Sequence, residues 1–256
     1  MTAASDARAP TRTAVIGVGY LGRFHAQKYA QLPQSRLVAV VDAEGAAAAR
    51  VGAELGVPGV GDYRDLLGQV DAVSLAVPTP LHHPIGRALL EHGIHVLIEK
   101  PIATTVTEAR ELIDVAREHN CTLQVGHLER FNPAILAAAG RLKQLRFVES
   151  HRLAPFKLRG TDVSVVLDLM IHDIDLIQEL VGAPIESIDA VGASVFSSEI
   201  DIVNARIRFH GGCVANTTAS RISMKQERKL RIFQDDAYLS IDLQQKILTV
   251  IRKKDA

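Results

Sequence analysis

The stretch AVIGVGYLG (14–22), followed at 37–42 by LVAVVD, decides the fold of this chain. An apolar strand, a glycine-rich turn and a second apolar strand in this order are typical of a dinucleotide-binding unit. Gly17 permits the tight turn out of the first strand, and Gly19 lets the backbone approach a pyrophosphate. Gly22 lets the following helix pack closely on the strand. The turn therefore predicts a phosphate-binding helix N-terminus, where free N–H groups favour an anion.

The residues around this turn indicate which dinucleotide binds. Tyr20 to Leu32 can form the helix, and Asp42 ends the second strand, twenty residues after Gly22. A carboxylate at that place accepts hydrogen bonds from the ribose hydroxyls of NAD and repels the additional phosphate of NADP. No arginine follows Asp42 directly, so we expect NAD as the cofactor. The alternative is an ordinary strand, turn and helix with a solvated Asp42.

The first half of the chain alternates between strand and helix patterns. Strands apolar on both faces that alternate with helices predict a parallel sheet covered by helices. We therefore expect a doubly wound α/β Rossmann domain over residues 11–126. Strands are predicted at AVIGV, LVAVV, GVPGV, AVSLAV, HVLIE and TLQVG, and helices at 20–32, 44–55, 63–67, 83–92 and 106–119.

The second half, residues 127–256, has a different character. Helices are predicted at 132–145, which opens with Asn-Pro, and at 163–181, which Gly182 and Pro184 stop. Runs with strand character then follow closely, and the FHGGC segment predicts a hairpin turn. This half is predicted to be an α+β domain with a largely antiparallel sheet. The strand runs are SIDAVGASVF, DIVNARIRFH, CVANTTASR, KLRIFQDDAYLSIDL and KILTVIR.

Composition excludes several classes of function. The 256 residues carry 29 basic and 29 acidic side chains without a block of like charge, so the chain has no footprint for nucleic acid or an anionic membrane. Cys121 and Cys213 form neither a metal spacing nor a disulfide framework, which fits a reducing compartment. No run approaches the roughly 20 apolar residues of a membrane span, and the first eleven residues do not resemble a signal peptide. We expect a cytoplasmic protein with a small-molecule partner.

The tripeptide EKP follows the fifth strand and supplies the first chemical candidates. Glu99 and Lys100 lie at the carboxyl end of this strand, where open parallel sheets bind ligands. Lys100 is expected to face the crevice, the alternative being a solvated lysine at a strand end. His82 and His83, in VPTPLHH after the fourth strand, are expected on the nicotinamide side of the cofactor. His83 can equally be an exposed helix start.

The segment DLMIHDID supplies the second set of candidates. Asp168, His172 and Asp175 stand at i, i+4 and i+7 of a predicted helix, hence on one face. A histidine can take the proton of a hydroxyl while hydride leaves the same carbon, and a carboxylate can orient it. The alternatives are acids favoured by the helix dipole beside a core histidine, and a metal site. The metal site is disfavoured because no further His or Cys stands at ligand spacing.

These motifs in this order resemble the Gfo/Idh/MocA oxidoreductase family. The resemblance spans nearly the whole chain and implies a catalytic group of Lys100, Asp168 and His172. It implies His172 as acid/base, Asp168 as its partner or a substrate ligand, and Lys100 as the group that polarises the reacting oxygen. The cofactor contacts expected on the first domain are Gly17, Gly19, Tyr20, Leu21, Gly22, Asp42, Pro78, Thr79, His82, Glu99 and Lys100.

Within the family, the segments 125–134 and 159–177 resemble the enzymes that oxidise the 3-hydroxyl of UDP-N-acetylglucosamine or of its uronic acid. That resemblance implies a UDP-sugar substrate, a ketone product used in amino-sugar biosynthesis of the lipid A type, and substrate contacts at Arg130, Asn132 and His172. An arginine fork suits diphosphate or carboxylate oxygens. The alternative for Arg130 is a salt bridge that closes the domain interface.

The resemblance also leaves other functions open. A dehydrogenase of another cyclic polyol such as inositol is the second candidate, and a non-catalytic NAD-binding regulator is the third. Regulators of this family tend to lack the lysine and the histidine that this chain has. The family implies a homo-oligomer through the sheet of the second domain. It also implies further chain beyond Ala256, so we expect either a truncated chain or a minimal second domain.

Overall fold

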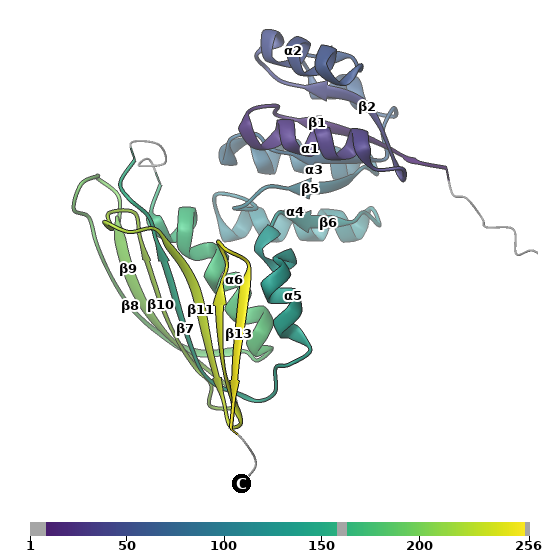
Figure 1. Cartoon of the computed structure of the whole chain (residues 1–256). Helices are drawn as coiled ribbons and strands as arrows, with labels where there is room; N and C mark the ends of the chain where they lie inside the picture. The colour runs from purple at the N-terminus through teal and green to yellow at the C-terminus, as the bar shows by residue number, and fades with distance from the viewer. Residues whose placement is uncertain (1–8, 158–162, 254–256) are drawn as a thin grey trace, which may run out of the picture. The chain divides into compact units, whose positions relative to one another are not determined.

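A computed structural model describes residues 9–157 and 163–253 of the chain. The chain divides into two compact units, Met1–Gly126 and His127–Ala256, each with its own sheet and its own hydrophobic core (Figure 1). Of the first eleven residues, which do not resemble a signal peptide, residues 1–8 lie outside the described part. No helix in the described part is long and apolar enough to cross a membrane.

The first unit contains a six-stranded parallel sheet with the order β3-β2-β1-β4-β5-β6. This is the doubly wound order, in which the strand order reverses between β1 and β4, and ligands bind at the carboxyl ends of the strands there. The predicted Rossmann fold is therefore confirmed. The strands are β1 (Thr11–Ile16), β2 (Ser35–Val41), β3 (Gly59–Val60), β4 (Ala72–Leu75), β5 (His95–Ile98) and β6 (Leu123–Val125).

Helices cover both faces of this sheet because its strands are apolar on both sides. Val15 of β1 packs in one cluster with Ala26 and Val51, whereas its neighbours Ala14 and Ile16 pack in a second cluster that holds residues of α3 and α4. The predicted helix at 63–67 is only a 3₁₀ turn. The elements are α1 (Tyr20–Gln31), α2 (Gly45–Leu55), η1 (Tyr63–Leu66), η2 (Thr79–Leu81), α3 (His82–Glu91) and α4 (Val106–Glu118).

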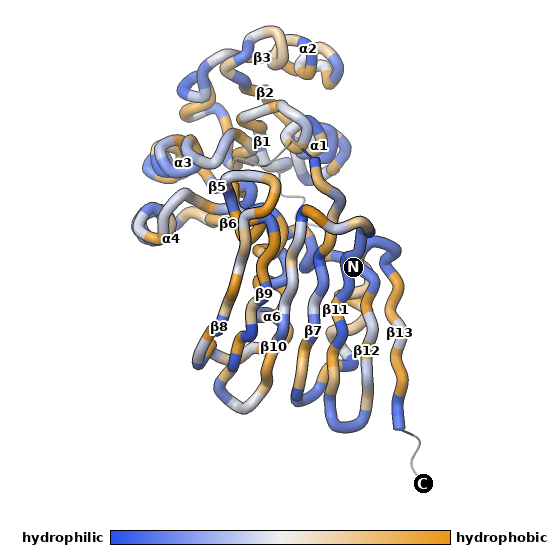
Figure 2. Tube along the Cα trace, turned by 90° about the vertical axis from the view of Figure 1, so that its left-hand side faces the viewer, coloured by the Kyte–Doolittle hydropathy of each residue, from blue (hydrophilic) through white to orange (hydrophobic). Residues whose placement is uncertain are grey.

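The second unit contains a seven-stranded sheet with the order β13-β12-β11-β7-β10-β9-β8. Only the central pair, β7 and β10, is parallel, so the sheet is mixed and mostly antiparallel, as predicted. Hydrophobic and hydrophilic residues alternate along its strands (Figure 2). The strands are β7 (Leu145–Leu153), β8 (Ile185–Ala193), β9 (Ile202–Phe209), β10 (Val214–Ser220), β11 (Glu227–Gln234), β12 (Ala237–Asp242) and β13 (Ile247–Arg252).

Two helices, α5 (Pro133–Ala139) and α6 (Ile171–Val181), lie on one face of this sheet (Figure 1). Ala138 of α5 and Leu176 and Ile177 of α6 are fully buried in the cluster that also holds Phe209. The prediction of one helix over 132–145 is wrong beyond Ala139, because Gly140 ends α5. The sequence did not predict β7, which begins where that helix was expected to end.

The predicted hairpin at FHGGC is confirmed. β9 and β10 pair antiparallel, and Gly211 and Gly212 both have positive φ, +92° and +90°. Such a turn needs residues that tolerate this conformation, which glycine does without a steric penalty.

The connection between β8 and β9 is organised around a single carboxylate. Asp201 is fully buried, and its Oδ2 accepts hydrogen bonds from the backbone N–H groups of Val195, Phe196 and Ser197 at 2.8, 2.7 and 2.9 Å. The Ser197 hydroxyl donates to Oδ1 at 2.7 Å. The Ser197 hydroxyl and these backbone donors hold the pKa of Asp201 well below its usual value. The charged carboxylate is therefore what holds the loop together.

We expect the contribution of Asp201 to stability to depend on pH. Because its pKa is lower in the folded than in the unfolded chain, the contribution is complete above the unfolded value of about 3.9 and is lost as the pH falls toward the folded value. The melting temperature of Asp201→Asn should lie below that of the wild type at neutral pH, and the gap should shrink below about pH 4. Asp189→Asn, at an exposed carboxyl of β8, is the control. A gap that stays constant from pH 6 to pH 3 would contradict this role.

Candidate functional site

A cavity of about 420 Å³ lies in the first unit at the carboxyl ends of β1, β2 and β4. The sequence placed the dinucleotide turn and Asp42 at this edge, and they line the cavity together with residues of the β3 and β4 loops. Pro78 of the β4 loop was a predicted contact, whereas Asp62, Tyr63 and Arg64 were not, because nothing in β3, a strand of two residues, marks the loop that follows it. The lining includes Gly17, Gly19, Asp42, Asp62, Tyr63, Arg64, Pro78, Leu81 and Ile85.

The three glycines of the turn fit a bound pyrophosphate for different reasons. Gly17 has φ +84°, and a Cβ there would lie 2.6 Å from the carbonyl oxygen of Ala76. A Cβ at Gly22 would lie 1.7 Å from the carbonyl oxygen of Gly17, which is the close helix-to-strand contact expected from the sequence. A Cβ at Gly19 would meet nothing within 4 Å, so the backbone is open on that side. Tyr20 begins α1 directly after this open position.

Asp42 is held at the wall of the cavity by two backbone groups. Its Oδ2 accepts a hydrogen bond from Val18 N–H at 2.9 Å, and its Oδ1 accepts one from Glu44 N–H at 2.9 Å. The carboxylate is thereby fixed beside the glycine turn, with lone pairs left for ribose hydroxyls. The chain therefore fits the adenosine half of NAD.

We expect NAD to bind about 10 to 100-fold more tightly than NADP, because the 2′-phosphate of NADP would face the Asp42 carboxylate and lose the ribose hydrogen bonds. Isothermal titration with both cofactors measures the ratio. In Asp42→Ala the ratio should fall toward one, while Asp65→Ala, in the exposed η1 turn, should keep it. Equal affinities in the wild type would refute the role of Asp42.

Lys100 directly follows Glu99, which belongs to a network of polar side chains at the end of β5. His25 Nε2 lies 3.0 Å from Glu99 Oε1, and His25 Nδ1 lies 3.0 Å from the Ser74 hydroxyl, which also contacts the Tyr29 hydroxyl at 2.8 Å. Glu99 Oε2 accepts from the backbone N–H of Lys100 at 3.3 Å. Burial alone would raise the pKa of Glu99, but His25 and the Lys100 groups outweigh it and lower that pKa. Glu99 thus fixes the backbone at Lys100.

The two neighbouring histidines at the start of α3 have structural partners. His82 is 1% exposed, and its ring nitrogens lie 2.8 Å from Pro101 O and 2.9 Å from Val77 O. The His82 side chain thus ties the β4 loop to the β5 loop, and a contact of His82 with the cofactor stays a prediction. Thr79 and Pro78 remain predicted contacts.

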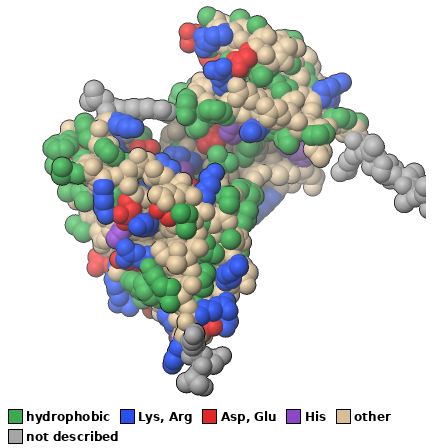
Figure 3. Space-filling model, viewed as in Figure 1, with side chains coloured by type: hydrophobic (Ala, Val, Ile, Leu, Met, Phe, Trp, Pro, Cys, Tyr) green, Lys and Arg blue, Asp and Glu red, His purple; other side chains and the backbone are tan. Residues whose placement is uncertain are grey.

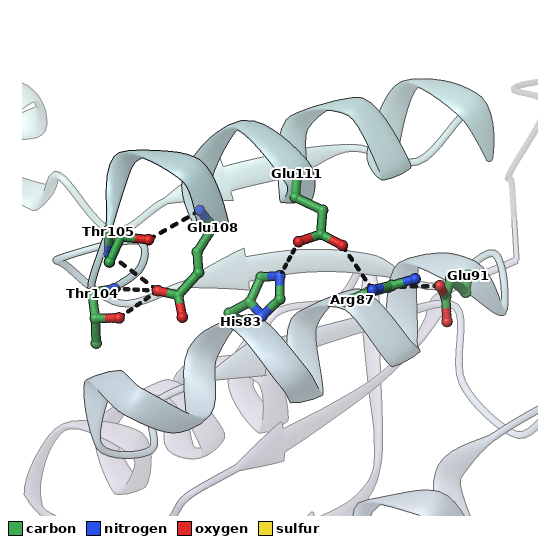
Figure 4. Close-up of polar contacts among 7 residues, drawn as sticks. All are labelled: His83, Arg87, Glu91, Thr104, Thr105, Glu108 and Glu111. Carbon is green, nitrogen blue, oxygen red and sulfur yellow. Dashed lines mark hydrogen bonds and ion pairs between the residues drawn. The ribbon is translucent and has the colours of Figure 1, made fainter.

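His83 joins a polar network between α3 and α4 (Figure 4). Its Nε2 lies 2.9 Å from Glu111 Oε2, and Glu111 Oε1 accepts from Arg87 at 2.7 Å. Figure 4 also shows the capping box at the start of α4, formed by Thr105 and Glu108. His83 therefore stabilises the helix pair rather than standing free in solvent.

In the second unit, Asp168 and His172 lie on either side of the junction between a π-helical turn, η4 (Val166–Met170), and α6. The wider turn changes the side-chain spacing from that of a regular α-helix. His172 lines a cavity of about 390 Å³, and Asp168 lines a neighbouring one of about 160 Å³. Both cavities share Leu169 and Arg228. The expected pair therefore lines two neighbouring cavities, and a joint catalytic role of Asp168 and His172 stays a prediction.

A buried ion pair beside His172 was missed by the sequence analysis. Arg152 of β7 donates from Nε and Nη2 to both oxygens of Asp173, at 3.0 and 2.9 Å. The two side chains are 3% and 1% exposed, and burial raises the pKa of Asp173. Glu129 lies 3.4 Å from Arg152. The sequence could have indicated this ion pair only through the position of Arg152 in β7, and β7 was not predicted.

The predicted substrate contacts Arg130 and Asn132 both have partners within the second unit. Arg130 donates to Asp175 at 2.8 and 2.6 Å and to Glu179 at 2.6 Å, which ties the η3 turn (Leu128–Phe131) to α6. The Asn132 side chain is buried: it caps α5 through Ala134 N–H and donates to Leu243 O at 2.9 Å. The hydrogen bonds described for the Arg130 guanidinium and the Asn132 amide all go to groups of the second unit. A direct contact of these side chains with the substrate stays a prediction.

Other chemistries find no support among residues 9–157 and 163–253. No group of three or more His, Cys, Asp or Glu side chains in this part can hold a metal ion. Cys121 and Cys213 are free thiols, and burial raises the pKa of both, which makes them poor nucleophiles. On the face shown in Figure 3, Lys and Arg side chains are interspersed with Asp and Glu, without a block of one sign.

Comparison with known proteins identifies both halves of the chain. Residues 11–127 match the model of the oxidoreductase family with an NAD-binding Rossmann fold, and residues 136–240 match the Gfo/Idh/MocA C-terminal domain. UDP-N-acetylglucosamine 3-dehydrogenase from Acidithiobacillus ferrooxidans is 44% identical over 233 residues, which are 90% of this chain and 74% of that enzyme.

A solved structure of that enzyme superposes with a TM-score of 0.92 at 40% identity and covers 97% of this chain and 82% of its own. The scyllo-inositol 2-dehydrogenase (NAD(+)) of Bacillus subtilis is more distant, with 28% identity over 83% of this chain and 68% of that enzyme. The chain therefore belongs to the Gfo/Idh/MocA family of oxidoreductases, with an NAD-binding Rossmann domain followed by the C-terminal domain of the family.

Proposed function

We propose that this protein oxidises the 3-hydroxyl of UDP-N-acetylglucosamine to the 3-keto sugar with NAD as the electron acceptor. The observation that carries the proposal is the 44% identity to a UDP-N-acetylglucosamine 3-dehydrogenase across 90% of the chain. The inositol dehydrogenase relative is clearly more distant. The dinucleotide cavity with its fixed Asp42 and the cavity beside His172 supply the two kinds of site that such a reaction needs.

The proposed chemistry assigns one task to each residue of the catalytic group. Bound NAD supplies the acceptor for the hydride that leaves C3. His172 takes the proton of the 3-hydroxyl, because an imidazole near neutral pKa is suited to that transfer. By the family resemblance, Lys100 polarises the oxygen that becomes the ketone, and Asp168 orients His172 or binds the sugar. The secondary alcohol loses a hydride from C3 and a proton from its oxygen, so the products are the ketone, NADH and a protonated base.

A substrate panel tests this proposal. NADH absorbance is measured with NAD and UDP-N-acetylglucosamine, its uronic acid, UDP-glucose, free N-acetylglucosamine or myo-inositol. Only the UDP-linked acetamido sugars should react, with the non-uronate sugar preferred, because binding of the remote UDP positions C3 for reaction. Where no NADH absorbance appears, a 2-oxoacid acceptor is added to reoxidise tightly held NADH, and the keto sugar is measured instead of NADH. Oxidation of inositol or the free sugar would assign the protein to another branch of the family.

The uronic acid and a cyclic polyol are the alternative substrates, and a non-catalytic NAD-binding regulator is the third candidate. The presence of Lys100, Asp168 and His172 disfavours the regulator. A folded sample that binds NAD but none of the sugars would support it.

We also propose that the protein forms a homo-oligomer through the sheet of the second unit. No described helix covers the face of this sheet opposite α5 and α6 (Figure 1). Phe233 stacks there on Tyr238 at 4.9 Å between ring centroids and contacts Phe147. Aromatic side chains that are only half-buried on an uncovered sheet face favour association. Sedimentation velocity should show a dimer or larger, and a monomer at micromolar concentration would refute the proposal.

A further inference from the structure

The cavity beside His172 has an excess of positive charge. Among the described residues, the cations of its lining are Arg152, Arg228 and Lys246, and its one acid is Glu129. Asp173 adds one further carboxylate through its ion pair with Arg152. Three cations against two acids leave an unbalanced positive charge in a concave site, which raises the local concentration of an anionic ligand.

Arg228 is more accessible to a ligand in this cavity than Arg152 is. In the sheet register it lies directly opposite Arg152, so two guanidinium groups stand side by side on the helix-covered face. Arg152 is committed to Asp173 at 2.9 and 3.0 Å, and Glu129 lies nearer to Arg152 (3.4 Å) than to Arg228 (4.0 Å). The Arg228 side chain is 42% exposed. Its fork therefore retains donors for an external ligand.

Lys246 is held at the same cavity by the turn between β12 and β13. Asp242 Oδ1 accepts hydrogen bonds from the N–H groups of Gln244 and Gln245 at 3.0 and 2.8 Å, and Lys246 itself has φ +60°. A non-glycine residue in this conformation is uncommon and needs support from its surroundings. The bond from Asn132 to Leu243 O supplies that support and ties the turn to the cavity wall. Asn132 is thereby a positioning residue for Lys246.

We propose that Arg228 and Lys246 bind the diphosphate of the nucleotide-sugar substrate, next to the sugar that His172 deprotonates. This inference rests on the proposed function. In UDP-N-acetylglucosamine the diphosphate is the only anionic group, and it is joined to the reacting ring. An arginine fork pairs with phosphate oxygens in a bidentate manner, and a lysine adds a point charge. Arg228 also lines the adjoining cavity of Asp168, so one guanidinium borders both candidate catalytic side chains.

The experiment compares UDP with UMP in the full chain by isothermal titration, because these ligands differ by one phosphate. The wild type should bind UDP more tightly than UMP. Arg228→Gln and Lys246→Gln should each weaken UDP binding about 10 to 100-fold and reduce the ratio of the two affinities. Arg228→Lys should weaken it less. The control is Lys143→Gln, which removes one exposed charge at the opposite end of β11, where Lys143 N–H bonds Gln234. Circular dichroism and melting curves check that each variant folds.

The outcomes separate this inference from the proposed function. If the wild type binds UDP and both glutamine variants keep its affinity ratio, the diphosphate assignment is overturned while the proposed substrate stands. If the variants lose affinity only for the uronic acid sugar and not for UDP, the cavity binds a carboxylate and the assignment is also overturned. A wild type that binds UDP as predicted but does not oxidise UDP-N-acetylglucosamine sinks the proposed reaction and leaves the diphosphate site supported. A wild type without affinity for UDP overturns both.

Discussion

Replacing His172 by Asn, or Lys100 by Met, is expected to lower turnover about 10²–10⁴-fold while NAD binding changes little, the usual contribution of a positioned acid or base. His172 lines the cavity of the second unit, whereas the expected NAD contacts belong to the first. Lys100 is only one of these expected contacts, so we expect its replacement alone to change NAD affinity little. A loss in kcat at unchanged NAD affinity is therefore the signature of a role in proton transfer. Steady-state rates with UDP-N-acetylglucosamine and titration of NAD measure the two quantities.

His210→Asn is the control for these variants, because His210 stands exposed in the hairpin between β9 and β10. It should keep the turnover of the wild type. Wild-type turnover in either His172→Asn or Lys100→Met would show that the assigned role of that residue is wrong.

Removing Arg152 is expected to have the largest effect on stability. Arg152→Met leaves the Asp173 carboxylate buried without its partner, and breaking a buried pair in this way costs about 3–5 kcal/mol. The double variant Arg152→Met/Asp173→Leu removes both charges and should recover most of that loss, since a buried ion pair adds little over a well-packed apolar pair. Chemical denaturation of the full chain, followed by circular dichroism, measures the free energies of unfolding.

Arg146→Met is the matched control on the same strand, because Arg146 and its partner Asp235 are 54% and 66% exposed. It should change stability little. If Arg152→Met unfolds at the same denaturant concentration as Arg146→Met, the buried pair does not have the structural role assigned to it.

The fold of the first unit could be predicted from the sequence because the pattern of each strand and turn agrees with the order of strands and helices along the chain. Each strand of the parallel sheet is an apolar run with a turn at its end, and the glycines have steric reasons visible in the motif. The helix predicted at 63–67 was misjudged, since four residues capped by Asp62 stop at a single 3₁₀ turn. The cavity wall at Tyr63 and Arg64 could not be predicted, because it depends on how loops from different strands meet.

The second unit was harder because its central strand has buried polar residues. In β7 the buried positions include Ser150 and Arg152, so the apolar alternation that indicates a strand is interrupted. Because β7 was not predicted, Arg152 could not be recognised as the partner of Asp173. Asp173 was therefore not predicted to be more buried than the other acids of the helix. Asp168 and His172 were recognised as candidates, but the π-helical turn at Val166–Met170, which precedes α6, leaves no mark in residue spacing.

The most direct test of the proposed reaction follows the hydrogen on C3 of the sugar. UDP-N-acetylglucosamine deuterated at C3 is incubated with the protein and NAD, and the reduced cofactor is analysed by mass spectrometry. The account predicts that one deuterium is transferred to the nicotinamide ring and that the sugar product lacks it. A slower rate than with the unlabelled sugar is expected where hydride transfer limits turnover. Unlabelled NADH formed from this substrate would show oxidation at another carbon and would contradict the account.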